Sequence, residues 1–162
     1  MTQLCFQDYY PEALAHCYGC GRLNEHGHQI KSYWDGDESV CHFMPKSYHI
    51  AVPGYVYGGL LASLIDCHGT GTAAAALYKA AKEADPHAEP NTRTLTASLH
   101  VDYHKPTPLG IELEVRGKVK HLGGRKVVIE EWIIANGVVT VRGEVVAVQV
   151  PESMLDELLK GK

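Results

Sequence analysis

The sequence predicts an α+β fold in which one long helix packs against an antiparallel sheet. Residues 57–83 show the i, i+3, i+4, i+7 apolar spacing of an amphipathic helix. Residues 94–150 instead show the two-residue alternation of half-buried strands, interrupted by glycine and proline turns. Because no helix separates one of these later strands from the next, we expect them to pair as consecutive hairpins rather than as parallel βαβ units.

The predicted helix contains one carboxylate, Asp66, beside its most apolar stripe. Aspartate is unfavourable in a helix interior because its short side chain bonds the backbone more readily in other conformations. The glycines at positions 69 and 71 each cost roughly 1 kcal/mol relative to alanine. The small residues beside Asp66 would let another backbone or a ligand approach. Asp66 is therefore a candidate catalytic residue, with a solvated helical carboxylate as the alternative.

The shorter elements are predicted from proline and glycine positions. Pro11 suits the first turn of a short helix over 11–17, and a second short helix is expected over 151–160. Two strand-like runs, 29–34 and 38–44, flank an Asp-Gly pair that is a strong hairpin signal. A chain of 162 residues with these elements fits a single domain.

Charge and composition exclude several classes of protein. A formal charge of −4 and a pI near 6.2 argue against a nucleic-acid protein and against a membrane-surface binder, because both need a basic surface. No segment approaches the roughly 18 apolar residues of a membrane span, and the N-terminus lacks the regions of a secretory signal. We therefore expect a cytoplasmic protein whose five cysteines are reduced thiols.

Two of these cysteines, Cys17 and Cys20, have the C-x-x-C spacing of half a zinc site. The alternative is a glycine turn packed by two buried thiols. Since no second pair is present at finger-like spacing, we expect no metal, and we expect Cys67 to be an ordinary thiol. The histidines that could complete a zinc site are His16, His26 and His28.

The segment PGYVYGGLLASLID, residues 53–66, is similar to the P-G-x-x-H-G-G-x-x-x-x-x-x-D segment of the hotdog-fold acyl-CoA thioesterase superfamily. The branch it resembles is that of the 4-hydroxybenzoyl-CoA and phenylacetate-pathway thioesterases. The C-x-G-C-G-x-x-N run at 17–24, the strand and break SLHVDYHKPTPLG and the GGRK turn support the resemblance. It implies a sheet wrapped around the central helix, and active sites at the interface of a homodimer or of a dimer of dimers.

The resemblance also implies roles for individual residues. Asp66 matches the catalytic acid and would activate water or attack the thioester directly. Gly58 matches the glycine whose backbone N–H meets the thioester oxygen, so the N–H of Gly58 or Gly59 would stabilise the oxyanion. Thr96 lies where related enzymes carry a hydroxyl that positions water. Tyr57 replaces the histidine of H-G-G and would either donate a hydrogen bond or anchor the helix start.

A CoA substrate would bring several phosphate charges, so basic groups are expected near the pocket mouth. One predicted hairpin concentrates them, and arginine can bind phosphate through two hydrogen bonds. Plain solubilising charge is the alternative interpretation. No cofactor is expected beyond the CoA of the substrate. The candidate CoA-binding residues are Arg116, Lys118, Arg125 and Lys126, together with Lys120.

The predicted function is hydrolysis of an acyl-CoA thioester without a metal. Besides Tyr57, a second departure from the family pattern is Ala51, which replaces a polar amide of some members. These departures keep open a non-catalytic acyl-CoA binder of the same fold. A dehydratase of this fold is a further rival, and it would need His49 or His68 paired with a carboxylate.

Overall fold

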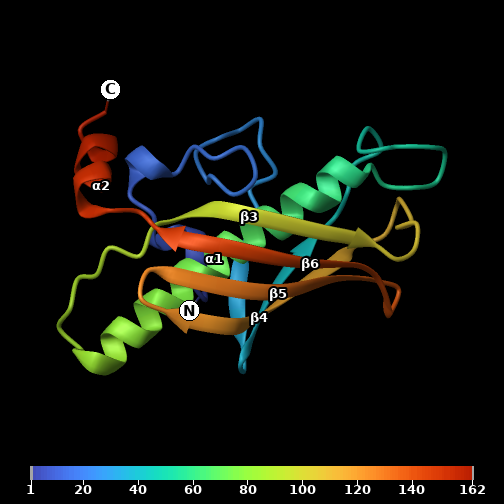
Figure 1. The fold of residues 1–162 in the computed structure, drawn as a ribbon. Helices are drawn as coiled ribbons and strands as arrows, with labels where there is room; N and C mark the ends of the chain where they lie inside the picture. The colour runs from blue at the N-terminus through green and yellow to red at the C-terminus, as the bar shows by residue number, and fades with distance from the viewer. Residues whose placement is uncertain (1, 162) are drawn as a thin grey trace.

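The computed structural model describes residues 2–161 and consists of a long helix packed across one face of a six-stranded antiparallel sheet (Figure 1). This arrangement confirms the predicted α+β class. The helix is α1 (Gly58–Ala84), and the strand order in the sheet is β1-β2-β4-β5-β6-β3. The strands are β1 (Ser32–Asp35), β2 (Glu38–Phe43), β3 (Thr94–Tyr103), β4 (Leu113–Gly123), β5 (Lys126–Ala135) and β6 (Val138–Gln149).

The core lies between α1 and the central strands. Leu64 and Ile65 of α1 are 1% and 0% exposed, and they belong to the same buried cluster as Val115, Ile129 and Val145 of three adjacent strands. Each such side chain stabilises the fold by about 1.5–3 kcal/mol through burial. Although α1 has 27 residues, no helix in the described part of the chain is long and apolar enough to span a bilayer.

Hairpin turns join the strands where the sequence predicted them. Asn136 and Gly137 have φ values of 49° and 74°, as a type I′ turn requires at its two central residues. Gly36, between β1 and β2, also has a positive φ of 66°. These glycines let the strands reverse direction without the steric cost that a side chain would add.

The predicted helix over 11–17 is wrong. Only Glu12–Leu14 forms a helical turn there, of the 3-10 type, and it follows a first 3-10 turn at Phe6–Tyr9. The N–H groups of Leu14 and Ala15 bond the carbonyls three residues earlier, and the chain then turns so that the Ala15 carbonyl accepts a 3.0 Å hydrogen bond from the N–H of Leu23. The central and C-terminal helices form near their predicted bounds, the latter as α2 (Glu152–Leu159).

Gly69 lets α1 approach the sheet closely. A Cβ at this position would lie 2.5 Å from Oε2 of Glu131 on β5 and 2.6 Å from Cγ2 of Val145 on β6. Small residues were expected to leave space beside Asp66 for another backbone or a ligand. At Gly69 the sheet fills that space. The helix therefore accepts a glycine in its interior because packing compensates for the lost propensity.

We predict that Gly69→Ala destabilises the protein although alanine is the better helix former. The new methyl group would overpack the interface between α1 and the sheet and lower the free energy of unfolding by about 1–3 kcal/mol. Gly58→Ala is the matched control, since its Cβ would lie 3.5 Å from the Tyr103 ring, an ordinary contact. Urea unfolding of both variants checks this, and a Gly69→Ala protein as stable as Gly58→Ala would contradict the proposed close approach.

Candidate functional site

Asp66 and Thr96 are brought together where α1 meets the edge strand β3. The Thr96 hydroxyl donates a hydrogen bond to Oδ1 of Asp66, and Oδ2 accepts none from the described residues. Asp66 is half-buried, whereas Thr96 is exposed. The register of β3 against β6 shifts between Thr96 and Ser98, which is the local irregularity of a β-bulge. One carboxylate oxygen is thus fixed by the sheet edge and the other is left free.

The predicted oxyanion donors lie at the start of α1. Helix α1 begins after Tyr57, whose carbonyl accepts a hydrogen bond at 3.1 Å from the N–H of Leu60. The N–H groups of Gly58 and Gly59 find no acceptor among residues 2–161. The first N–H groups of a helix have no partner within it and carry the positive end of the helix dipole. These two amides can therefore receive an anionic oxygen.

Two tyrosines shape the helix start, and one of them was not singled out from the sequence. The hydroxyl of Tyr103, at the end of β3, donates a 2.7 Å hydrogen bond to the Gly58 carbonyl. Burial, followed by the neighbouring Tyr57 phenol, raises the pKa of Tyr103. The ring of Tyr57 folds over Gly59, where a Cβ would lie 2.4 Å from the nearest ring carbon. Nothing in the sequence pattern pairs Tyr103 with a backbone carbonyl 45 residues away.

The two halves of the predicted site are separated along α1. Asp66 follows Gly58 by eight residues, which corresponds to about 12 Å along a helix axis. Helical side chains tilt toward the N-terminus, so the Asp66 carboxylate recovers only a few ångströms of this distance. A reacting carbonyl needs both its oxyanion donor and its nucleophile at about 3 Å. One chain therefore does not gather the Gly58 amide and Asp66 around a single thioester.

A second acid, Glu131, is buried beneath α1, and the sequence reasoning missed it. Its side chain is fully buried, and neither carboxylate oxygen has a hydrogen-bond partner within the described residues. Burial, and then the negative charge of Asp66, raise the pKa of Glu131 well above 4.5, so it is held uncharged. It lies opposite Gly117 and Gly143 on the neighbouring strands, and Gly69 of α1 leaves room for its carboxylate, since a Cβ there would lie 2.5 Å from Oε2. The missed signal was an acid on the buried side of an alternating strand.

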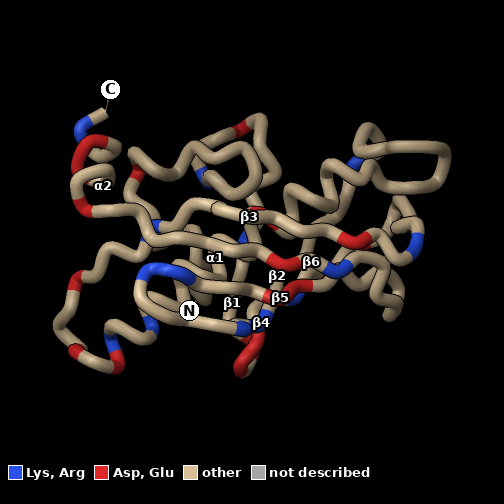
Figure 2. Tube along the Cα trace, viewed as in Figure 1, with Lys and Arg blue, Asp and Glu red and all other residues tan. Residues whose placement is uncertain are grey.

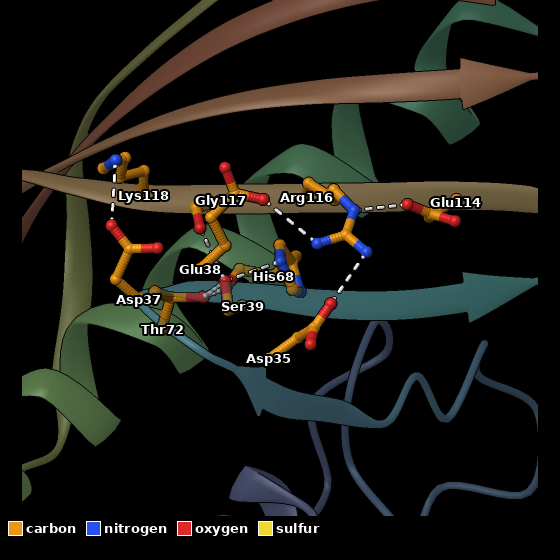
Figure 3. A network of polar contacts seen from close by, with 10 residues as sticks. All are labelled: Asp35, Asp37, Glu38, Ser39, His68, Thr72, Glu114, Arg116, Gly117 and Lys118. Atoms are coloured by element: carbon orange, nitrogen blue, oxygen red, sulfur yellow. Dashed lines mark hydrogen bonds and ion pairs between the residues drawn. The ribbon is translucent and has the colours of Figure 1, made fainter. Parts of the chain in front are cut away.

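His49 and His68, the two histidines considered for a dehydratase, have no carboxylate partner among the described residues. His68 is fully buried, and its Nδ1 lies 2.8 Å from the Ser32 hydroxyl. Its Nε2 lies 2.9 Å from the Ser39 hydroxyl (Figure 3). Burial lowers the pKa of His68 to about 3, so the ring is neutral. Nδ1 of His49 accepts a hydrogen bond from the N–H of Lys46. Within residues 2–161 neither ring is hydrogen-bonded to an acid, and the dehydratase alternative loses its support.

Three of the five basic residues expected to bind CoA already have acidic partners. Arg116 is only 23% exposed and forms ion pairs with three carboxylates at once (Figure 3). Lys118 is 3.0 Å from Oδ2 of Asp37. Lys120 Nζ is 2.7 Å from Oε2 of Glu144. A phosphate group would have to compete with these acids for all three side chains. The carboxylates bound by Arg116 are those of Asp35, Glu38 and Glu114.

The other two basic candidates lie at the turn between β4 and β5, which Figure 2 shows as a blue segment away from the red loop between β1 and β2. The Arg125 guanidinium donates a 2.7 Å hydrogen bond to the Gln149 carbonyl and remains exposed. Lys126 is exposed and forms no ion pair with any described residue. This turn therefore offers the more accessible positive charge.

Comparison with known proteins identifies the family. Residues 53–141, more than half of the chain, match the family model described as the thioesterase superfamily. A thioesterase superfamily protein from Shewanella loihica PV-4, with a crystal structure, is 46% identical and superposes with a TM-score of 0.66 over 88% of this chain and 100% of that one. The chain belongs to the thioesterase superfamily, and its fold is the hotdog fold expected from the resemblance.

Two further relatives are less complete or more distant. The acyl-coenzyme A thioesterase THEM4 of Xenopus laevis is 36% identical over 88 residues, which are 54% of this chain and 33% of that protein. The chain thus spans about a third of the length of this relative. The PaaI protein of the E. coli phenylacetic acid degradation operon shares 16% identity with a TM-score of 0.58, over 76% of this chain and 81% of that one, and supports the fold alone.

We predict that Glu131→Gln changes how stability depends on pH. A carboxyl whose folded-state pKa is raised stabilises the fold below its unfolded pKa near 4.5, and this stabilisation is lost as pH rises through the folded-state pKa. The variant should therefore gain stability relative to the wild type as pH rises from about 4.5 toward the raised folded-state pKa of Glu131.

Denaturant unfolding across this pH range measures the difference between the two proteins. Glu130→Gln, which removes a carboxylate from the exposed side of the same strand, is the matched control. A difference between Glu131→Gln and wild type that stays constant with pH would contradict an uncharged Glu131.

Proposed function

We propose that the protein hydrolyses an acyl-CoA or related acyl thioester, with Asp66 as the catalytic carboxylate. The observation that carries the proposal is a half-buried acid whose one oxygen is held by Thr96 while the other stays free at the sheet edge. Membership of the thioesterase superfamily supports the reaction class. An acid placed in this way can act on a carbonyl without a metal ion.

In this mechanism the Thr96 hydroxyl orients Asp66 through Oδ1, and the free Oδ2 takes a proton from water. The water oxygen bonds to the thioester carbon, and the carbonyl oxygen becomes an oxyanion held by backbone N–H groups. When the carbon–sulfur bond breaks, the departing thiolate takes the proton from Asp66. Direct attack by Oδ2, followed by hydrolysis of the resulting anhydride, is the other route open to the same carboxylate.

The missing oxyanion donors are supplied in this proposal by a second copy of the chain. β3 is the last strand of the sheet, and its outer edge pairs with no other strand of residues 2–161. Leu95 and Leu99 on this strand are 47% and 40% exposed, an unusual exposure for apolar residues on an open edge. Pairing of two β3 strands would satisfy the unpaired edge, cover the exposed leucines and give a two-fold symmetric homodimer.

The register within one chain supports this pairing. Thr96, near one end of β3, contacts Asp66, whereas Tyr103, at the other end, contacts Gly58. Antiparallel pairing of two β3 strands about Leu99 places the Thr96 end of one chain beside the Tyr103 end of the other. Asp66 of one chain then faces the Gly58 amide of its neighbour, which removes the separation of about 12 Å along α1. A dimer of such dimers remains a prediction that the site does not require.

In this proposal the CoA phosphates are bound by the exposed Arg125 and Lys126, and Arg116 and Lys118 contribute only where their acidic partners release them. Tyr57 would add its phenol as a further donor beside the Gly59 amide. The placement of the Tyr57 ring over part of the helix start also favours the alternative function, a non-catalytic acyl-CoA binder. Ligand-dependent thermal stabilisation of wild-type protein without thioester cleavage, across short, long and aromatic acyl-CoAs, would support that alternative.

We predict that Asp66→Asn keeps the fold and loses nearly all thioesterase activity, because the amide cannot accept the proton. Gly58→Pro should also fold, since proline is tolerated at the first helical position and Tyr57, with ψ of 129°, has the extended conformation required before proline. It removes one oxyanion donor, and kcat should fall about 100- to 1,000-fold.

Steady-state assays on a panel of acyl-CoA substrates measure both effects. Gly58→Ala retains the N–H and should keep kcat within a fewfold of wild type. Equal turnover by Asp66→Asn and wild type would eliminate the proposed catalytic role. Equal turnover by Gly58→Pro and Gly58→Ala would eliminate the Gly58 amide as the oxyanion donor.

A further inference from the structure

Three cysteines from two distant segments of the chain meet beside α1. Cys17 and Cys20 come from the N-terminal loop, and Cys67 follows Asp66 on the helix. Their three sulfur atoms lie within 4.8 Å of one another, and Cys17 Sγ is 3.7 Å from Cys67 Sγ. None of the three forms a disulfide. Zinc–thiolate bonds of about 2.3 Å place two sulfurs of a tetrahedral site about 3.8 Å apart, so this spacing suits a metal ion.

The loop around Cys17 packs closely against the helix. A Cβ at Gly19 would lie 2.2 Å from Cys67 Sγ, so only glycine lets the loop come this close to α1. A hydrogen bond of 2.8 Å from the Gly21 N–H to the Cys17 carbonyl closes the turn.

Charge favours a divalent ion at this position. The guanidinium of Arg93, 4.3 Å from the centre of the Tyr10 ring, supplies a positive charge near Cys20. Three thiolates, one divalent ion and Arg93 together would be neutral.

We propose that Cys17, Cys20 and Cys67 bind a zinc ion through three thiolates. No fourth His, Cys, Asp or Glu of residues 2–161 joins the group, so water or another small donor would complete the coordination. Cys17 is partly exposed while the other two cysteines are buried, which leaves the open position on the Cys17 side. The ion joins the N-terminal loop to α1 at the residue after Asp66 and takes no part in thioester hydrolysis.

The sequence indicated half of this site at Cys17 and Cys20, with histidines as the candidate partners. The structure provides a third cysteine instead, because folding places the first third of α1 beside the loop. Cys67 had no recognisable spacing relative to the C-x-x-C pair, 47 residues earlier. Only the tertiary fold identifies it as a ligand.

Cadmium binding by untagged, fully reduced, metal-free protein tests the site. Cd²⁺ bound to thiolates gives an ultraviolet charge-transfer band, and zinc should displace it. We expect one equivalent to bind and to release protons, since the ligands must lose them. Cys67→Ser and Cys17→Ser should each weaken binding by more than about 10-fold, because even changes outside the ligand set cost that much. The matched controls, Cys5→Ser and Cys41→Ser, remove buried free cysteines outside the group and should bind as wild type does.

Thermal unfolding provides a second measurement for variants that bind weakly. Zinc should raise the melting temperature of wild type and Cys41→Ser, but not that of Cys67→Ser, because only a ligand that binds the folded state stabilises it. Equal cadmium affinity in wild type and Cys67→Ser would overturn the proposal. So would reduced wild-type protein that takes up no metal and forms only a disulfide between Cys17 and Cys67 in air. Neither result would affect the proposed hydrolysis by Asp66.

Discussion

The close packing of α1 on the sheet is the constraint on which the rest of the structure depends. Gly69 removes the side chain that would hold the helix away, so the sheet and helix meet at van der Waals distance. This contact fixes the height of Asp66 above the sheet edge and brings it within hydrogen-bond reach of Thr96. It also buries Glu131, whose uncharged carboxyl lies under the same helix.

The geometry of a helix explains why, in one chain, Asp66 and the proposed oxyanion donors lie at two separate places along α1. Backbone donors are free only in the first turn, whereas Asp66 lies more than two turns later. No side-chain rotation closes that distance. The open edge strand β3 contacts Asp66 near one end and Gly58 at the other. Antiparallel pairing of two such strands would bring the Asp66 end of one chain to the Gly58 end of the other. In the proposed dimer the same edge would serve as both interface and active-site wall.

Much of this organisation follows from local sequence rules. The helix, the hairpin turns and the position of Asp66 were predictable because period, glycine and proline patterns act over a few residues. The contacts that define the site were harder to predict because they join residues far apart in sequence, such as Tyr103 with Gly58 and Cys67 with Cys17. The burial of Glu131 depends on the close approach of Gly69 on α1, which no single-strand pattern reveals.

Subunit complementation tests the shared site most directly. Asp66→Asn and Gly58→Pro chains, each inactive alone, are co-refolded so that mixed dimers form. Each mixed dimer then has one site with an intact Asp66 from one chain and an intact Gly58 amide from the other, so statistical mixing should restore about a quarter of wild-type activity. Activity that stays at the level of the two inactive parents, in a sample shown to contain mixed dimers, would contradict a site built from two chains.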